Sequence, residues 1–329
     1  MELSRSADPH DWIAAGLVGY TLPEPDKILL GDESLRRAVA ALPNDRLALI
    51  AAIRACRGGI QYSEPNSRFD QTASCPVPDA PSRLLKLEPK NLYAWLSVII
   101  PRGLDQNGAG QVLWKYRHDP AENARIRALI AKAAKSTTWD AGTPEFLAIK
   151  AKAYGIDYFP MDRSLFDRNQ DETASADELK DSQWHTWGEA WVQPGVGTWT
   201  LESICNPLVS EVDDALRSDC TRIFQMLSDS KGEFRTIMSG WAGMLRLNKG
   251  TPVEAEIEAR WQQHLWLEEQ RLWAREREPI AASHQYMQDF AALGQWEADL
   301  RQADRVGVAR QPPPSWDPAL HPSLQPFGF

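Results

Sequence analysis

The sequence contains no long hydrophobic run and no excess of positive charge. No stretch of about 18 or more apolar residues occurs, and the mean hydropathy is -0.44. The 329 residues carry 36 Lys and Arg against 45 Asp and Glu, which is a formal net charge of -9. No basic stripe interrupts this acidic character, so the chain as a whole repels phosphate backbones. We therefore expect neither a membrane-spanning protein nor a nucleic-acid-binding protein.

Sequence motifs of common enzymes and metal sites are also missing. The chain has no GxSxG, Walker loop, dinucleotide fingerprint or HExxH. It has no CxxC or HxxxH spacing that would suit a metal ion either. We predict no cofactor and no metal, while an enzyme with an unfamiliar helical fold remains an alternative.

Helical periodicity is the dominant pattern in the chain. Apolar residues recur at spacings of three and four, as at Leu35, Val39 and Leu42, and period-2 alternation is nearly absent. Asp32 or Ser34 is the expected N-cap of this helix. The pattern predicts an all-α fold of antiparallel helical hairpins.

The composition divides the chain into four regions. We predict an N-terminal helical region over residues 1–156 and a polar linker or loop over 157–181. A C-terminal helical region over 182–310 follows. Residues 311–329 form a proline-rich tail, which cannot be helical and either hangs free or lies extended along the body.

Two long helices are expected before the tail, over about 252–278 and about 280–305. In the first helix an apolar face is formed by Ile257, Trp261, Leu265 and Leu272. Acidic residues are expected on the other, solvent-facing side, namely Glu254, Glu258, Glu268 and Glu269. Further upstream, Gly240 and Gly243 are expected to permit close packing between helices.

Four cysteines fall into two local pairs. Cys56 ends one expected helix, and Cys75 lies just ahead of another. Cys205 ends a third helix, and Cys220 is expected to open the amphipathic run 220–227. If the helices of each pair fold back as a hairpin, their cysteines become neighbours that satisfy disulfide geometry.

The cysteines also bear on the cellular compartment. Disulfides persist in oxidising surroundings, so we expect the bacterial periplasm. The first residues lack the basic and apolar regions of a signal peptide, and a signal would therefore have been removed. The alternative is a cytoplasmic protein with four buried free thiols.

One junction carries a family resemblance. Residues 82–98 read Ser-Arg-Leu-Leu-Lys-Leu-Glu-Pro-Lys-Asn-Leu-Tyr-Ala-Trp-Leu-Ser-Val. Pro89 ends a helix there, and Trp95 is expected to plug the gap between neighbouring helices. The segment resembles the junction between tetratricopeptide repeats, although Pro101 and the glycine-rich stretch 103–110 depart from that pattern. The resemblance implies a helical-repeat, α-solenoid-like protein that binds another protein.

The sharpest local group of polar residues surrounds His185. His185 and Glu189 are four residues apart, so on a helix they share one face and could form an acid/base pair. Two residues make an incomplete metal site. We expect Trp184, His185 and Glu189, together with Trp266, to belong to a protein-binding surface.

A second pair with the same spacing lies in the helix expected over 252–278. His264 and Glu268 are interpreted as a chance pair in a helix rich in glutamate. At about 100° per residue, Trp266 lies well away from Trp261. One of these tryptophans is therefore expected to be exposed or to cover a neighbouring layer.

Three functions fit these observations. The first, which we prefer, is a non-enzymatic protein-binding module of the bacterial periplasm, with an immunity or inhibitor protein that neutralises a secreted effector as one subtype. Its partner is another protein, and an acidic surface suits a basic one. The second is an enzyme that uses carboxylates and His185, and the third is a structural subunit of an envelope assembly.

Overall fold

The chain is all-α. The computed structural model describes residues 3–19, 25–56, 75–99, 116–146, 149, 198–208, 211–231, 234–277 and 280–320. The named helices are α1 (Pro9–Gly19), α2 (Pro25–Ala41), α3 (Arg46–Arg54), α4 (Ala80–Leu87), α5 (Leu92–Ile99), α7 (Pro120–Ala133), α10 (Thr198–Ile204), α11 (Asp214–Ser228), α12 (Phe234–Leu247), α13 (Glu254–Arg277), α14 (Ile280–Leu293) and α15 (Gln295–Val306). Short 3₁₀ helices η1 (Leu3–Arg5) and η3 (Pro318–Leu320) lie near the two ends. No strand occurs within these ranges, so the predicted fold class is confirmed.

Aspartate side chains begin three of the helices. Asp45 accepts a hydrogen bond from the Ala48 N–H at 2.8 Å at the start of α3. Asp119 accepts two such bonds from the first turn of α7, where Pro120 takes the first position. Asp213 caps α11 in the same way at 2.8 Å. Each helix thus starts where a side chain satisfies an N–H group that has no partner within the helix.

Two expected helix starts are wrong. Cys220 does not open its helix, because Asp213 caps α11 earlier and leaves Cys220 in its middle. Helix α2 begins at Pro25, a residue favoured at the first helical position, and not after Asp32 or Ser34. Ser34 is buried inside the helix, and its hydroxyl donates to the carbonyl four residues earlier at 2.7 Å.

The single helix expected over 280–305 is also wrong. The chain breaks at Gly294, whose φ of 90° favours glycine, and α14 and α15 form a hairpin. In α13, which matches the helix expected over 252–278, Glu258 is exposed as expected. Glu268 and Glu269 are instead buried, because α15 packs on α13 and the C-terminal segment covers it.

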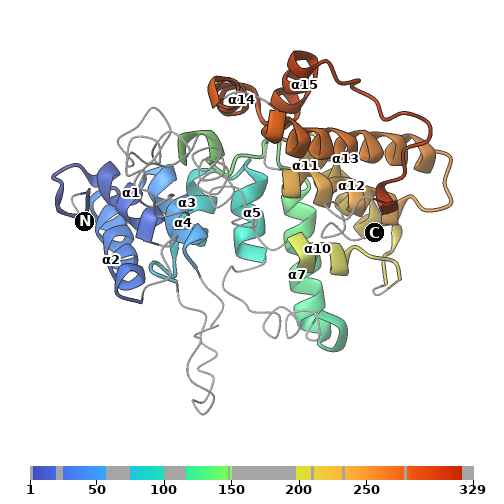
Figure 1. Cartoon of the computed structure of the whole chain (residues 1–329). Coiled ribbons are helices and arrows are strands. Elements are labelled where there is room, and N and C mark those ends of the chain that lie inside the picture. The colour runs from blue at the N-terminus through green and yellow to red at the C-terminus, as the bar shows by residue number, and fades with distance from the viewer. Residues whose placement is uncertain are drawn as a thin grey trace, which may run out of the picture.

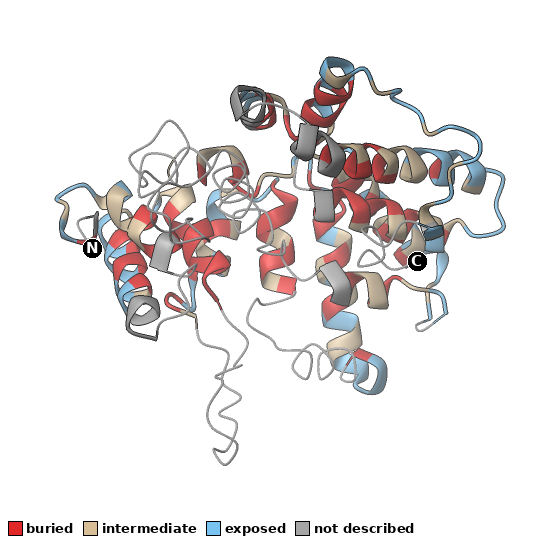
Figure 2. Cartoon of the chain, in the orientation of Figure 1, coloured by how far each residue is buried: buried red, intermediate tan, exposed pale blue. Residues whose placement is uncertain are grey.

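Successive helices pack against their neighbours and form a row (Figure 1). In chain order, α1 through α5 contact one another, α5 contacts α7, α7 contacts α11, and α11 leads through α12 to α13 and α15. Buried apolar residues from α1 through α13 form one continuous cluster along the inside of this row (Figure 2). Such packing is compatible with a helical-repeat fold. The linker predicted over 157–181 lies outside the described residues.

Both predicted disulfides are present. Cys56 is bonded to Cys75, and Cys205 to Cys220, so none of the four cysteines is free. The two staples span 19 and 15 residues of sequence. Disulfides are typical of an oxidising compartment. Among the described helices, none combines the length and apolar character needed to span a bilayer.

The junction that resembles a tetratricopeptide repeat is a turn between two helices. Helix α4 ends at Leu87 and α5 begins at Leu92. The Trp95 ring packs against the core, while its indole N–H donates to the Pro89 carbonyl at 2.8 Å. The Asn91 side chain donates to the Asp140 carbonyl at 2.8 Å and ties the turn to a later segment.

Glycines allow α11 and α12 to approach closely, as predicted. A Cβ atom at Gly240 would overlap the backbone of Ser228 and Phe224, and one at Gly243 would meet the Phe224 ring. These glycines therefore set the distance between α11 and α12, which both border the site described below.

The C-terminal segment lies against α13, as far as residue 320. The Trp316 indole N–H donates to Glu269 at 2.8 Å, and the Trp316 ring meets Trp266 edge-on at 5.6 Å. This matches the alternative in which the tail lies along the body. Residues 318–320 form a 3₁₀ turn, which corrects the expectation that no part of the tail is helical.

Candidate functional site

The residues predicted to form a protein-binding surface are only partly placed. Trp184, His185 and Glu189 lie outside the described residues, so their grouping stays a prediction. Trp266 is half-buried on α13, and its indole N–H donates to the Ala309 carbonyl at 2.7 Å. Trp266 thus holds the C-terminal segment and covers a neighbouring layer.

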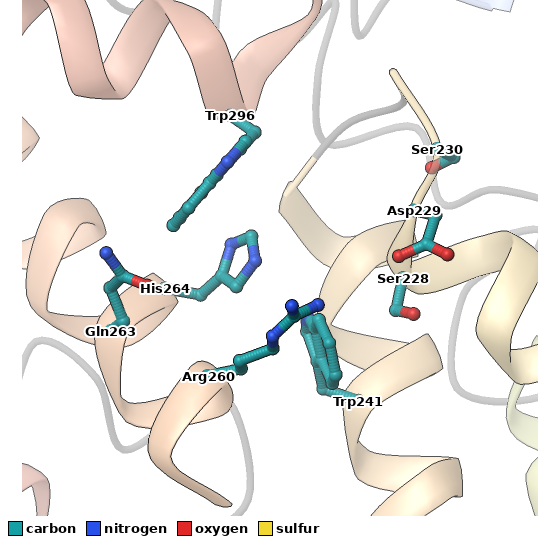
Figure 3. A pocket seen from close by; sticks show the side chains of 8 residues that line it. All are labelled: Ser228, Asp229, Ser230, Trp241, Arg260, Gln263, His264 and Trp296. Atoms are coloured by element: carbon teal, nitrogen blue, oxygen red, sulfur yellow. The ribbon is translucent and has the colours of Figure 1, made fainter. Parts of the chain in front are cut away.

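A pocket of about 350 Å³ opens between the end of α11 and helices α12, α13 and α15 (Figure 3). It is lined by Ser228, Asp229, Ser230, Trp241, Arg260, Gln263, His264 and Trp296. This volume is at the lower end of the range for ligand pockets. Because four elements contribute to it, the pocket forms only in the folded chain.

Local sequence features place the pocket residues. Arg260 and His264 are one turn apart on α13 and therefore share one face of that helix. Trp296 is the second residue of α15 and follows the break at Gly294, which turns the ring toward α13. Trp241 comes from α12.

His264 stands between the two tryptophans in this pocket. Its ring centroid is 3.8 Å from that of Trp296 and 5.7 Å from that of Trp241. The residue is only 7% exposed, and its ring nitrogens have no hydrogen-bond partner among the described residues. Burial and the positive charge of Arg260 lower the pKa of His264 to about 3. His264 is therefore neutral at physiological pH and is poorly suited to be a general base there.

Arg260 and Trp241 bring further hydrogen-bond donors to the pocket. The Arg260 guanidinium lies 5.9 Å from the Trp241 ring centroid and is exposed to solvent. In the described ranges it makes no ion pair or hydrogen bond. The Trp241 indole N–H is buried and has no acceptor there either. An unsatisfied buried N–H costs about 1–3 kcal/mol.

The opposite wall is the end of α11, which is polar. Asp229 accepts a hydrogen bond from the Gln225 amide at 2.5 Å. The hydroxyls of Ser228 and Ser230 donate to carbonyls of α11 at 2.9 and 2.8 Å. Figure 3 shows the Asp229 carboxylate and the Arg260 guanidinium on opposite sides of the opening. The pocket can therefore receive a group that both accepts and donates hydrogen bonds.

A buried charge network lies behind the pocket, between α13, α14 and α15. Arg271 donates to Glu268 at 2.8 Å, Gln295 donates to Glu268 at 3.3 Å, and the Tyr286 hydroxyl donates to Asp299 at 2.7 Å. Burial and the nearby Glu268 charge raise the pKa of Asp299 well above its usual range. When Asp299 is protonated, it adds no second negative charge beside the buried ion pair of Glu268 and Arg271. The network therefore fixes α15, and with it Trp296.

Two further hollows adjoin the pocket. One of about 310 Å³ shares Trp241 and Arg260 with it, and another of about 780 Å³ shares Asp229 and Ser230. Both also border Gln225 of α11. Together with the pocket they form one hollowed surface, which we call the α11 surface.

Metal binding has no support in the described ranges, where no group of three or more His, Cys, Asp or Glu side chains could hold an ion. Sequence reasoning singled out His264 and Glu268 by their spacing but interpreted them as a chance pair, with Glu268 on the solvent-facing side. It missed Arg260 and Trp296 altogether. The only available signal was the repetition of Arg260, His264, Glu268 and Arg271 along one face of α13.

Comparison with known proteins gives no relative from which a function could be transferred. No protein-family model matches the chain, and no curated protein or solved structure matches it.

Proposed function

We propose that this chain is a non-enzymatic protein-binding module of the bacterial periplasm, built as a tetratricopeptide-like helical array. The observation that carries the proposal is the α11 surface, where three adjoining hollows meet around Arg260 and Trp241. A small molecule would fill one hollow, whereas a chain of several residues would cover all three.

The chemistry of this surface supports binding of a protein. Trp and Arg are the side chains most enriched among residues that dominate binding energy. Trp241 and Arg260 lie where the pocket meets the 310 Å³ hollow, and Val253 adds an apolar side chain that is 46% exposed. Polar side chains such as Asp229 border the pocket, as expected of an interface rim.

The fold supports the rest of the proposal. The described helices pack on their neighbours in sequence, and such arrays present extended surfaces for other proteins. Two disulfides favour an oxidising compartment, for which the periplasm is our proposal. The net charge of -9 suits a partner that is basic overall. Neutralisation of a secreted effector is one role that fits such a module.

Site-specific photo-crosslinking in the native host tests the proposal. A benzophenone amino acid at Val253, in the 310 Å³ hollow, is compared with the same group at Leu87 on α4. These positions are 46% and 44% exposed, and Leu87 does not line the α11 surface. We expect position 253, and not position 87, to capture one defined partner protein.

A charge reversal then ties this capture to the surface. Arg260→Glu should abolish capture at position 253. Arg36→Glu should preserve it, because Arg36 is an exposed arginine on α2 with no bond to other described groups. If positions 253 and 87 capture the same proteins, or if Arg260→Glu has no effect, the α11 surface is not the binding site.

A further inference from the structure

Three neighbouring groups in the pocket have hydrogen-bonding capacity that the described part of the chain does not use. They are the exposed Arg260 guanidinium, the buried Trp241 indole N–H and the ring of His264, a residue that is only 7% exposed. All three line the same pocket. The guanidinium and the indole are donors only, whereas a neutral imidazole offers one N–H donor and one acceptor nitrogen. Donors are therefore in excess among these three groups, which favours a ligand group that accepts hydrogen bonds.

Arg260 differs from those arginines of the described helices that pair with carboxylates. Arg46, Arg127, Arg246 and Arg271 each form such a pair. A guanidinium presents its N–H groups in a planar fork that matches the two oxygens of a carboxylate. Resting beside the Trp241 ring, Arg260 offers that fork to a ligand.

We propose that the pocket binds an acidic side chain, aspartate or glutamate, from within the chain of the partner protein. This inference rests on the proposed function and names the anchor residue of the partner. The carboxylate pairs with the Arg260 guanidinium, which lies beside the Trp241 ring. The partner as a whole remains basic, and the acidic anchor gives the complex its orientation.

The neighbouring hollows favour an acidic residue that lies within the partner's chain and not at a chain end. The 310 Å³ hollow shares Arg260 with the pocket, and the 780 Å³ hollow shares Asp229 on the other wall. A partner chain that fills both hollows as well as the pocket therefore extends beyond the anchor residue. Asp229 repels a second anionic group and accepts from a backbone N–H of the passing chain, which a lone carboxylate cannot supply.

Matched small probes test the inference without knowledge of the partner. The full chain, labelled with nitrogen-15 in its tryptophan indoles, is titrated with N-acetylglutamate N-methylamide and with its neutral glutamine counterpart, up to tens of millimolar. The signal lost in Trp296→Phe identifies one pocket indole. We expect the acid to shift pocket signals with an affinity at least tenfold higher than that of the amide.

The variants make the test specific to Arg260. Arg260→Gln should remove the preference for the acid, while Arg36→Gln should retain it. N-acetylalanine, whose carboxylate is a chain end, should bind more weakly than the glutamate probe. Equal affinity for acid and amide, absence of binding by both, retention of the preference in Arg260→Gln, or stronger binding of N-acetylalanine overturns the inference. Partner capture that depends on Arg260 without a preference for acid would leave the proposed function standing and remove this inference alone.

Discussion

Acidification should destabilise the protein through His264, and replacing this residue should remove that effect. His264 is buried and neutral, with a pKa of about 3 in the folded chain against an ordinary value of 6.5 for histidine. Between these pH values the unfolded chain binds a proton that the folded chain does not bind. The free energy of unfolding therefore rises with pH across this window, and it falls as the pH drops below 6.5. At pH 5, which is about 1.5 units below the pKa of the unfolded chain, the free energy of unfolding is lower by roughly 2 kcal/mol.

The comparison uses His264→Phe, which keeps a ring between Trp241 and Trp296 but cannot be protonated. Asp299 acts with the opposite sign: its raised pKa contributes stability at low pH that is lost as the pH rises. Because Asp299 is present in both proteins, its contribution cancels in the difference between them. Urea unfolding of both proteins with intact disulfides, at pH 7.5 and pH 5, measures that difference.

We expect the wild-type protein to lose about 2 kcal/mol more than His264→Phe between these two pH values. The corresponding difference in melting temperature is several degrees. Parallel pH profiles of the two proteins would refute the reasoning, because they would mean that His264 titrates in the folded chain as it does in water. The difference in unfolding free energy between the two proteins at pH 7.5 reflects how well each ring packs, and it does not enter the test.

Three further perturbations follow from the described contacts. Asp299→Asn should gain stability relative to the wild-type protein as the pH rises above 3.8, since the raised pKa of Asp299 makes its ionisation unfavourable in the folded chain, and urea unfolding from pH 5 to 8 measures this. Gly240→Ala should cost about 2 kcal/mol or more, because the new Cβ overlaps the backbone of Ser228, and thermal unfolding that matches the wild-type protein would contradict the close packing of α11 and α12. Replacing both Cys205 and Cys220 with alanine should cost about 3 kcal/mol, because these residues close a 15-residue loop. Reduction should then destabilise the double variant less than the wild-type protein, since the variant has already lost this disulfide.

The α11 surface shows why a sequence reading cannot find such a site. Arg260 and Trp296 are far apart along the chain, and no motif relates them. They meet because Gly294 breaks the segment that periodicity alone predicts as one helix. A single glycine within a helical pattern does not reveal by itself whether the helix continues, since tertiary contacts decide that outcome.

The sequence by itself determined the local properties of the protein. Helical periodicity, the pairing of each cysteine with its neighbour in sequence and the close approach at Gly240 each depend on residues near one another in the chain, and each is found in the described structure. Only the tertiary structure decided which face of α13 is covered. Glu268 reads as a solvated residue, yet it is buried in a charge network because α15 packs over it. The same packing buries His264 and creates the pocket, since burial depends on what a helix meets and not on its own sequence.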